Sequence, residues 1–254
     1  MTEILNIKDL HANAGDKEIL KGLDLTIVLN DISFDVEEAD FIAIMGPSGS
    51  GKSTLANVIF NNPIYKKTSG EIDFIGENIN DLKTNEIANK GIFMSFQLPE
   101  EVPGITLMNF LKAAHSAKTQ EPVKVFAFKR QIEENMNKLN MNKNYASRDL
   151  NVGFSGGEKK KAEILQMLTL NPKLAILDET DSGLDVDAIR TVSSGINMFK
   201  NDENAVLIIT HSTKILENLD VDYVHILVNG QIIKTGTGEL AKQIEQEGYS
   251  EYLN

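Results

Sequence analysis

Short apolar runs alternate along the chain with longer segments whose apolar residues recur at helical spacing. The runs lie at residues 41–45, 92–96, 174–177 and 205–209, and each has the length of a strand that is buried on both faces. Helical spacing follows the first of them, at residues 55–60. Buried strands that alternate with helices predict an α/β protein with a largely parallel central sheet.

The N-terminal part carries a different pattern. Residues 3–10 and 19–27 alternate apolar and polar positions as half-exposed strands do, and residues 11–17 predict a turn between them. The nonamer 19–27 is followed directly by a second nonamer, 28–36, with the same apolar and polar positions. A local duplication, a junction between two related parents and chance all account for this repeat. We expect one copy to pair in a sheet and the other to be displaced or to extend an edge.

Three further segments complete the expected elements. Residues 68–77 predict a short hairpin, and residues 223–228 and 231–234 predict another around Asn229-Gly230, a pair typical of type I′ turns. Residues 105–150 carry helical spacing without a strand signal, which favours an inserted helical subdomain.

Composition narrows the class of protein. The 254 residues, 41% hydrophobic and 24% charged, suit one large α/β domain or one domain with an inserted subdomain. A net charge of −12 argues against nucleic-acid binding, which needs a basic surface. The absence of cysteine excludes disulfides and thiolate metal sites on this chain. No apolar run approaches the roughly 20 residues of a membrane span, and no signal peptide is evident, so we expect a cytoplasmic protein without membrane insertion.

A glycine-rich loop follows the first buried run. Its residues are Gly46, Pro47, Ser48, Gly49, Ser50, Gly51, Lys52, Ser53 and Thr54. Strand, loop and helix in this order match the phosphate-binding pattern G-x-x-x-x-G-K-[ST]. Glycines let backbone N–H groups surround phosphate oxygens, Lys52 can reach the outer phosphates, and the Ser53 hydroxyl can ligate Mg²⁺. An ordinary Gly/Ser turn is the plainer alternative, but every fixed position and both flanks match.

Polar residues follow three of the buried runs. Asp178 is placed to hold Mg²⁺ through water, and Glu179 to orient or deprotonate an attacking water. Gln97 could touch the same metal and water, and His211 could hold the terminal phosphate. Taken singly, the acid pair could equally cap a helix, while Gln97 is most often a polar strand end and His211 a structural histidine.

A second glycine pair opens a helix further along. Ser155, Gly156, Gly157 and Glu158 stand at the start of a helical segment that ends at residues 171–172. The N–H groups at such a helix start can bind an anion, although the same residues also make a simple helix cap.

Together these motifs resemble those of ABC-type ATPases. In that family the loop around Lys52 binds phosphate, Gln97 is the Q-loop, Ser155–Glu158 belong to the signature motif, Asp178 and Glu179 end the Walker B strand, and His211 is the switch histidine. The resemblance implies a P-loop ATPase that uses ATP and Mg²⁺, with an N-terminal antiparallel β subdomain. It also implies a head-to-tail homodimer in which the signature motif of one subunit completes the phosphate-loop site of the other.

The resemblance covers nearly the whole chain as one domain, 1–254. The catalytic core would comprise 1–97 and 165–254, and the helical subdomain about 98–164, with the signature motif in it.

Within the family, several segments are similar to SufC, the ATPase of the Suf iron–sulfur cluster assembly machinery. These are residues 60–63, 154–160, 178–185 and 248–249. The likeness implies SufB and SufD as partners and no membrane subunit, and iron and sulfur would then lie on the partner. Residues 28–54 look more like a transporter ATPase, which suggests a chimera. The alternative functions are therefore a transporter subunit or a recombined fold with little activity.

The lysine run 159–161 has two interpretations. It predicts a solvated helix face, or, more sharply, an ion pair between Lys160 and Glu179 or Asp181 that holds the catalytic carboxylate away from water.

Overall fold

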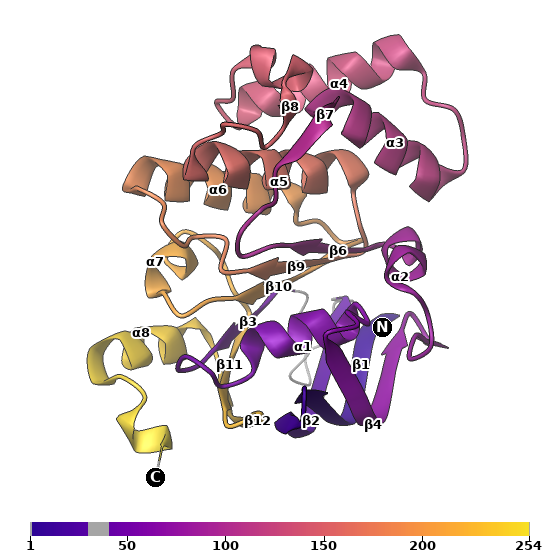
Figure 1. The fold of residues 1–254 in the computed structure, drawn as a ribbon. Coiled ribbons are helices and arrows are strands. Elements are labelled where there is room, and N and C mark those ends of the chain that lie inside the picture. The colour runs from indigo at the N-terminus through magenta and orange to yellow at the C-terminus, as the bar shows by residue number, and fades with distance from the viewer. Residues whose placement is uncertain (1, 30–40, 254) are drawn as a thin grey trace.

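A six-stranded sheet lies at the centre of the molecule, in a computed structural model that describes residues 2–29 and 41–253. The strand order is β12-β11-β3-β10-β9-β6, and every neighbouring pair is parallel except β11 and β12. The strands are β3 (Phe41–Met45), β6 (Ile92–Ser95), β9 (Leu174–Asp178), β10 (Ala205–Ile209), β11 (Tyr223–Val228) and β12 (Gln231–Gly236). The predicted α/β class with a mostly parallel sheet is confirmed (Figure 1).

The antiparallel edge of this sheet is the predicted hairpin. Asn229 and Gly230 have φ values of 50° and 84°, the signs that a type I′ turn requires. A Cβ on Gly230 would lie 1.9 Å from the carbonyl oxygen of Ile19, so only glycine allows the turn to approach the N-terminal strands this closely. The Lys21 N–H donates to the Gly230 carbonyl at 3.1 Å and fastens the two parts together.

The N-terminal strands form a second, antiparallel sheet, as the ABC resemblance implies. Its order is β2-β1-β4-β5, with β1 (Thr2–Ala14), β2 (Lys17–Leu29), β4 (Tyr65–Phe74) and β5 (Glu77–Asn78). The turn expected over residues 11–17 is present but shorter, at Gly15 and Asp16, because β1 continues to Ala14 and pairs with strands on both sides. The first nonamer lies within β2; most of the second falls at residues 30–40, outside the described residues.

Helices cover both faces of the central sheet. They are α1 (Lys52–Ile59), α2 (Thr84–Lys90), α3 (Leu107–Thr119), α4 (Val125–Lys138), α5 (Gly156–Leu170), α6 (Val186–Phe199), α7 (Thr213–Leu216) and α8 (Gly238–Glu247), with short 3₁₀ turns η1 (Lys143–Ser147) and η2 (Ser250–Tyr252). In Figure 1, α5 and α6 cover one face, α1 and the four-stranded sheet lie on the other, and α3 and α4 form an outer layer on α5. In the described parts of the chain, no helix is long and apolar enough to cross a membrane.

One feature of the helical region was not expected. Two short strands, β7 (Val102–Thr106) and β8 (Asp149–Leu150), pair within it, although the sequence carries no strand signal between residues 105 and 150. The pair is short and irregular, and the Asp149 carboxylate accepts from the Gly104 N–H at 2.8 Å. A pair of this kind depends on tertiary contact rather than on a local sequence pattern.

The core explains why the central runs are apolar without interruption. Phe41, Ala43 and Met45 of β3 face a cluster that includes α5 and α6, while Ile42 and Ile44 face a second cluster with α1, β1 and β2. Because side chains alternate between the two faces of a strand, a strand covered on both sides needs apolar residues throughout. Polar residues lie at or just after the carboxyl ends of these strands.

Candidate functional site

The phosphate loop joins β3 to α1. Gly49 and Gly51 have φ values of 78° and 111°, which favour glycine. Gly51 caps α1 and supplies no side-chain hydrogen bond to the helix start, so the first N–H groups of α1 are left to a ligand. The buried Ser50 hydroxyl has no hydrogen-bond partner. These features fit a group that supplies acceptor oxygens, such as phosphate.

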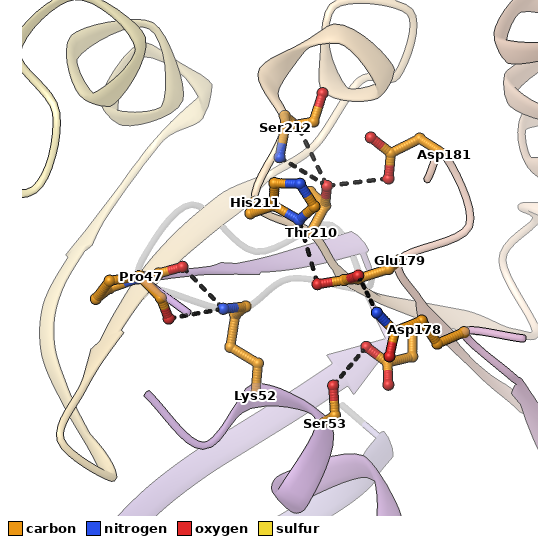
Figure 2. Close-up of polar contacts among 11 residues, drawn as sticks. Pro47, Lys52, Ser53, Asp178, Glu179, Asp181, Thr210, His211 and Ser212 are labelled. Atoms are coloured by element: carbon orange, nitrogen blue, oxygen red, sulfur yellow. Dashed lines mark hydrogen bonds and ion pairs between the residues drawn. The ribbon is translucent and has the colours of Figure 1, made fainter. Parts of the chain in front are cut away.

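Lys52 is folded back over this loop. Its side chain is buried, and Nζ donates to the carbonyl oxygens of Gly46 at 2.8 Å and Pro47 at 3.0 Å (Figure 2). Burial lowers the pKa of Lys52, and the nearby charges of Glu179 and Asp178 oppose that shift. The lysine is thus held beside the loop by weak backbone acceptors that an anionic oxygen would outcompete.

Ser53 and Asp178 form a pair of oxygen groups next to the loop. The Ser53 hydroxyl donates to Asp178 Oδ1 at 3.1 Å, as Figure 2 shows. Asp178 ends β9, and its N–H donates to the Ser95 hydroxyl at 3.1 Å. Burial raises the pKa of Asp178, and the hydrogen bond from Ser53 opposes the shift. A hydroxyl and a carboxylate are ligands that Mg²⁺ accepts.

Glu179 connects two other predicted residues. Its Oε2 accepts from Gln97 Nε2 at 2.6 Å, and its Oε1 lies 3.2 Å from His211 Nδ1. Glu179 has a φ of 46°, unusual for a residue with a side chain, and its N–H donates to the Ile209 carbonyl at 2.8 Å. Backbone strain of this kind gathers at functional sites. Three residues from distant parts of the sequence therefore meet through direct contacts.

A hydroxyl network that the sequence analysis missed supports this group. The buried Thr210 hydroxyl donates to Asp181 Oδ1 at 3.0 Å, and the Ser212 N–H donates to Thr210 Oγ1 at 2.9 Å (Figure 2). These contacts join the loop after Glu179 to the loop that carries His211. The only available signal was a threonine directly after a buried strand.

The second glycine pair has a different environment. Ser155 caps α5: its Oγ accepts from the Glu158 N–H at 3.3 Å, and Glu158 Oε2 accepts from the Ser155 N–H at 2.7 Å. Glu158 also accepts a hydrogen bond from the Tyr145 hydroxyl, and this bond is the largest cause of its lowered pKa. The Arg148 guanidinium lies 4.6 Å from the Tyr145 ring centre. The start of α5 therefore has a capping box, which satisfies the N–H groups of Ser155 and Glu158.

Both interpretations of Lys160 are wrong. The side chain is buried rather than solvated, and Nζ bonds to the Phe96 carbonyl at 2.6 Å and to Glu163 Oε2 at 3.2 Å, not to Glu179 or Asp181. The reason is the i,i+3 spacing to Glu163, which supplies a nearer carboxylate on the same helix.

The structure therefore arranges the predicted residues in two groups. Direct contacts link Lys52 to the loop, Ser53 to Asp178, and Glu179 to Gln97 and His211. The second group, Ser155 to Glu158, is linked by its contacts to residues 145–158 of the helical region.

Sequence comparison defines the class to which this architecture belongs. Residues 29–182, more than half of the chain, match the family described as ABC transporter. The chain belongs to this family and is an ABC ATPase, an enzyme that binds and hydrolyses ATP.

Two relatives are similar to this chain over nearly its full length. The chain is 43% identical to "Probable ATP-dependent transporter SufC" of Escherichia coli, over 97% of each chain. It is 44% identical to "Probable ATP-dependent transporter ycf16" of Cyanophora paradoxa, over 100% of this chain and 95% of that one. Similarity of this extent gives no support to the predicted chimera.

Solved structures agree on the fold. A nucleotide-free ATP-binding cassette from an ABC transporter superposes with a TM-score of 0.76 at 25% identity, covering 99% of both chains. A dimeric bacterial ABC transporter cassette gives a TM-score of 0.76 at 21% identity, covering 92% of this chain and 99% of that one. The latter likeness concerns the fold alone.

Proposed function

We propose that this chain is the ATPase of a cytoplasmic machinery that assembles iron–sulfur clusters, with SufB- and SufD-like scaffold proteins as partners. The observation that carries the proposal is the 43% identity to SufC over 97% of each chain. The lack of cysteine is consistent with it, because thiolate ligands for iron would then come from the partners.

At the site, Gly46 to Thr54 would bind the phosphates of ATP, with Lys52 on the outer phosphates. Ser53, Asp178 and the Gln97 amide oxygen are the groups that fit Mg²⁺, because the first two already lie 3.1 Å apart. When bound, Mg²⁺ would neutralise developing phosphate charge. Among the described residues, no group of three or more His, Asp or Glu side chains could hold a metal, so phosphate oxygens would complete the ligands.

In ATP hydrolysis, Glu179, Gln97 and His211 would have separate roles. Glu179 accepts the proton of the attacking water, whose oxygen bonds to the terminal phosphorus as the bond to ADP breaks. Gln97 and His211, one on each carboxylate oxygen, hold Glu179 in place.

A second copy of the chain would complete the site. Ser155, Gly156 and Gly157 lie at the start of α5, where their present bonds are with the helical region. In a head-to-tail dimer, this helix start would face the ATP bound at Lys52 of the other subunit. The helical subdomain, at about 98–164, would carry it there.

An apolar cavity supports a protein partner. It has a volume of about 560 Å³ and lies between α2, β6 and α3, with Phe60, Phe93, Phe96 and Phe110 in its lining. Phe96 is 58% exposed and Leu98, two residues on, is 81% exposed, values that are high for large apolar side chains. A partner segment that buries these side chains would contact the residues on both sides of Gln97.

Co-purification tests the partner. Tagged chain mixed with SufB and SufD should retain both proteins, while solubilised membrane permeases should not be retained. The Glu179→Gln variant serves as the matched control for turnover, because it should bind ATP and hydrolyse it very slowly. Retention of permeases in place of SufB and SufD would contradict the proposed assembly role.

The second candidate function is the nucleotide-binding subunit of a transporter. It is favoured by the names of the E. coli and Cyanophora relatives, both of which are called probable ATP-dependent transporters. The same co-purification decides between the two. A recombined fold with little activity would fail both binding tests and show no ATP turnover.

A further inference from the structure

An ion pair is buried within α5. Lys160 Nζ lies 3.2 Å from Glu163 Oε2, and both side chains are only 4% exposed. Burial raises the pKa of Glu163, and the Lys160 charge opposes the shift. A buried pair of this kind adds little net stability, because removing two charges from water costs about as much as their attraction returns. Stability alone therefore does not explain the pair.

Both members of the pair also hold one residue of the backbone. Glu163 Oε1 accepts from the Phe96 N–H at 2.7 Å, and Lys160 Nζ donates to the Phe96 carbonyl at 2.6 Å. Hydrogen bonds to ionised groups are roughly twice as strong as neutral ones. The two polar backbone atoms of Phe96 are thus fixed to α5 by two charged groups.

Phe96 is the residue before Gln97. It lies just beyond the end of β6 at Ser95, so the bonds of the central sheet no longer hold it. Its side chain lines the apolar cavity, while Gln97 Nε2 donates to Glu179 Oε2 at 2.6 Å. The place of the Gln97 amide therefore depends on how Phe96 is held.

We propose that Lys160 and Glu163 are positioning residues for ATP hydrolysis, which hold the Phe96 backbone so that Gln97 stays on Glu179. The inference rests on the proposed roles of Gln97 and Glu179. It has a mechanical consequence: the helix that begins at Ser155 and the segment that carries Gln97 move as one unit. A partner that displaces Phe96 in the cavity would act on both.

The test replaces the pair by apolar residues of similar volume, in Lys160→Met with Glu163→Leu. No charge is left unpaired, so the melting temperature should fall only by the cost of the two lost hydrogen bonds to the Phe96 backbone. The kcat for ATP should fall about tenfold, because a small misplacement of a catalytic group is costly. The KM should change little, because the phosphate loop is untouched. Lys161→Met, which changes the half-buried neighbouring lysine on the same helix, is the matched control and should leave kcat unchanged.

Two results would overturn the proposal. One is an unaltered kcat in the double variant, which would assign the pair to packing only. The other is a KM that rises while kcat holds. If the double variant does not fold, Glu163→Gln decides instead: it keeps an oxygen for the Phe96 N–H but weakens the bond, and kcat should fall about threefold. An unaltered kcat in that variant would also overturn the proposal.

Glu179→Gln, measured in parallel, separates this inference from the proposed function. Normal turnover in Glu179→Gln would remove the assigned catalytic role itself. If Glu179→Gln lost turnover while the pair variants kept a normal kcat, only the positioning role of Lys160 and Glu163 would be refuted.

Discussion

Glycine lies at the starts of both α1 and α5, yet the two helix starts differ in their capping. The α1 start has Gly51 as its cap and no side-chain acceptor for its N–H groups. The α5 start has Ser155 and Glu158, which satisfy each other's backbone donors. A helix end without its own acceptor favours an external anion, whereas a capped end is already stable alone. Glycine and a helix start do not by themselves define a primary phosphate site.

The largest expected effect comes from removing Lys52, the positively charged residue at the start of α1. Lys52→Ala should lower kcat/KM for ATP by about 10²–10³-fold, because a buried charge aimed at phosphate is lost. Equilibrium ATP binding and steady-state turnover measure it. Lys66→Ala, which removes an exposed lysine on β4, is the control and should have no effect. Unchanged ATP uptake in Lys52→Ala would refute the assignment of the loop.

A pair of glycine substitutions tests the comparison directly. Gly51→Ala forces a side chain into a φ of 111° and brings its Cβ within 3.1 Å of Leu20, so it should cost about 1–3 kcal/mol of unfolding free energy and weaken ATP binding. Gly156→Ala meets nothing within 4 Å and should change stability by less than about 0.5 kcal/mol. Urea unfolding and ATP titration measure both. Equal losses in the two variants would contradict the contrast.

The two helix starts differ in how much of their surroundings a local sequence pattern reveals. The loop at Lys52 follows from residue types and flanks that are local, so it could be assigned from the pattern. The cap of α5 could also be anticipated from Ser155 and Glu158. Its supports, Tyr145 and Arg148, lie on other segments that only folding brings near.

Long-range pairing explains the remaining errors. The strand that runs through residues 11–14 has no clear alternation, and its pairing on both sides overrides the turn signal. Lys160 looked like a surface lysine because charged residues are seldom buried. Its i,i+3 partner Glu163 was the available signal, but the sequence does not reveal that Phe96 would supply the remaining bonds.

A smaller effect should follow from opening the α5 cap. Ser155→Ala removes the hydroxyl that accepts from the Glu158 N–H, at a cost of about 1 kcal/mol in unfolding free energy. ATP binding at the loop of the same chain should be unchanged, because that helix start has no such cap. The urea midpoint measures the loss, with the exposed Ser69→Ala as control. A loss of ATP affinity in the isolated subunit would argue against independent helix ends.

The smallest effect concerns the acid dependence of the same cap. The Tyr145 hydroxyl is the main cause that holds the pKa of Glu158 below 4.5, followed by the Ser155 N–H. Because the folded pKa is below the unfolded one, the unfolded chain binds more protons in that window, and this contribution to stability is lost as pH falls through the folded pKa. Tyr145→Phe should move the pKa of Glu158 back toward 4.5, so that protonation begins at a higher pH.

Carboxyl ¹³C titration of Glu158 measures this shift directly, and urea midpoints between about pH 6 and about pH 3 measure its effect on stability. The Tyr145→Phe chain should show a shallower acid decline, since less of its stability depends on an ionised Glu158. Tyr65→Phe, a tyrosine on β4, serves as the control. If Glu158 titrated at the same pH in both chains, the tyrosine would not support the cap, which would then depend on Ser155 and Glu158 alone.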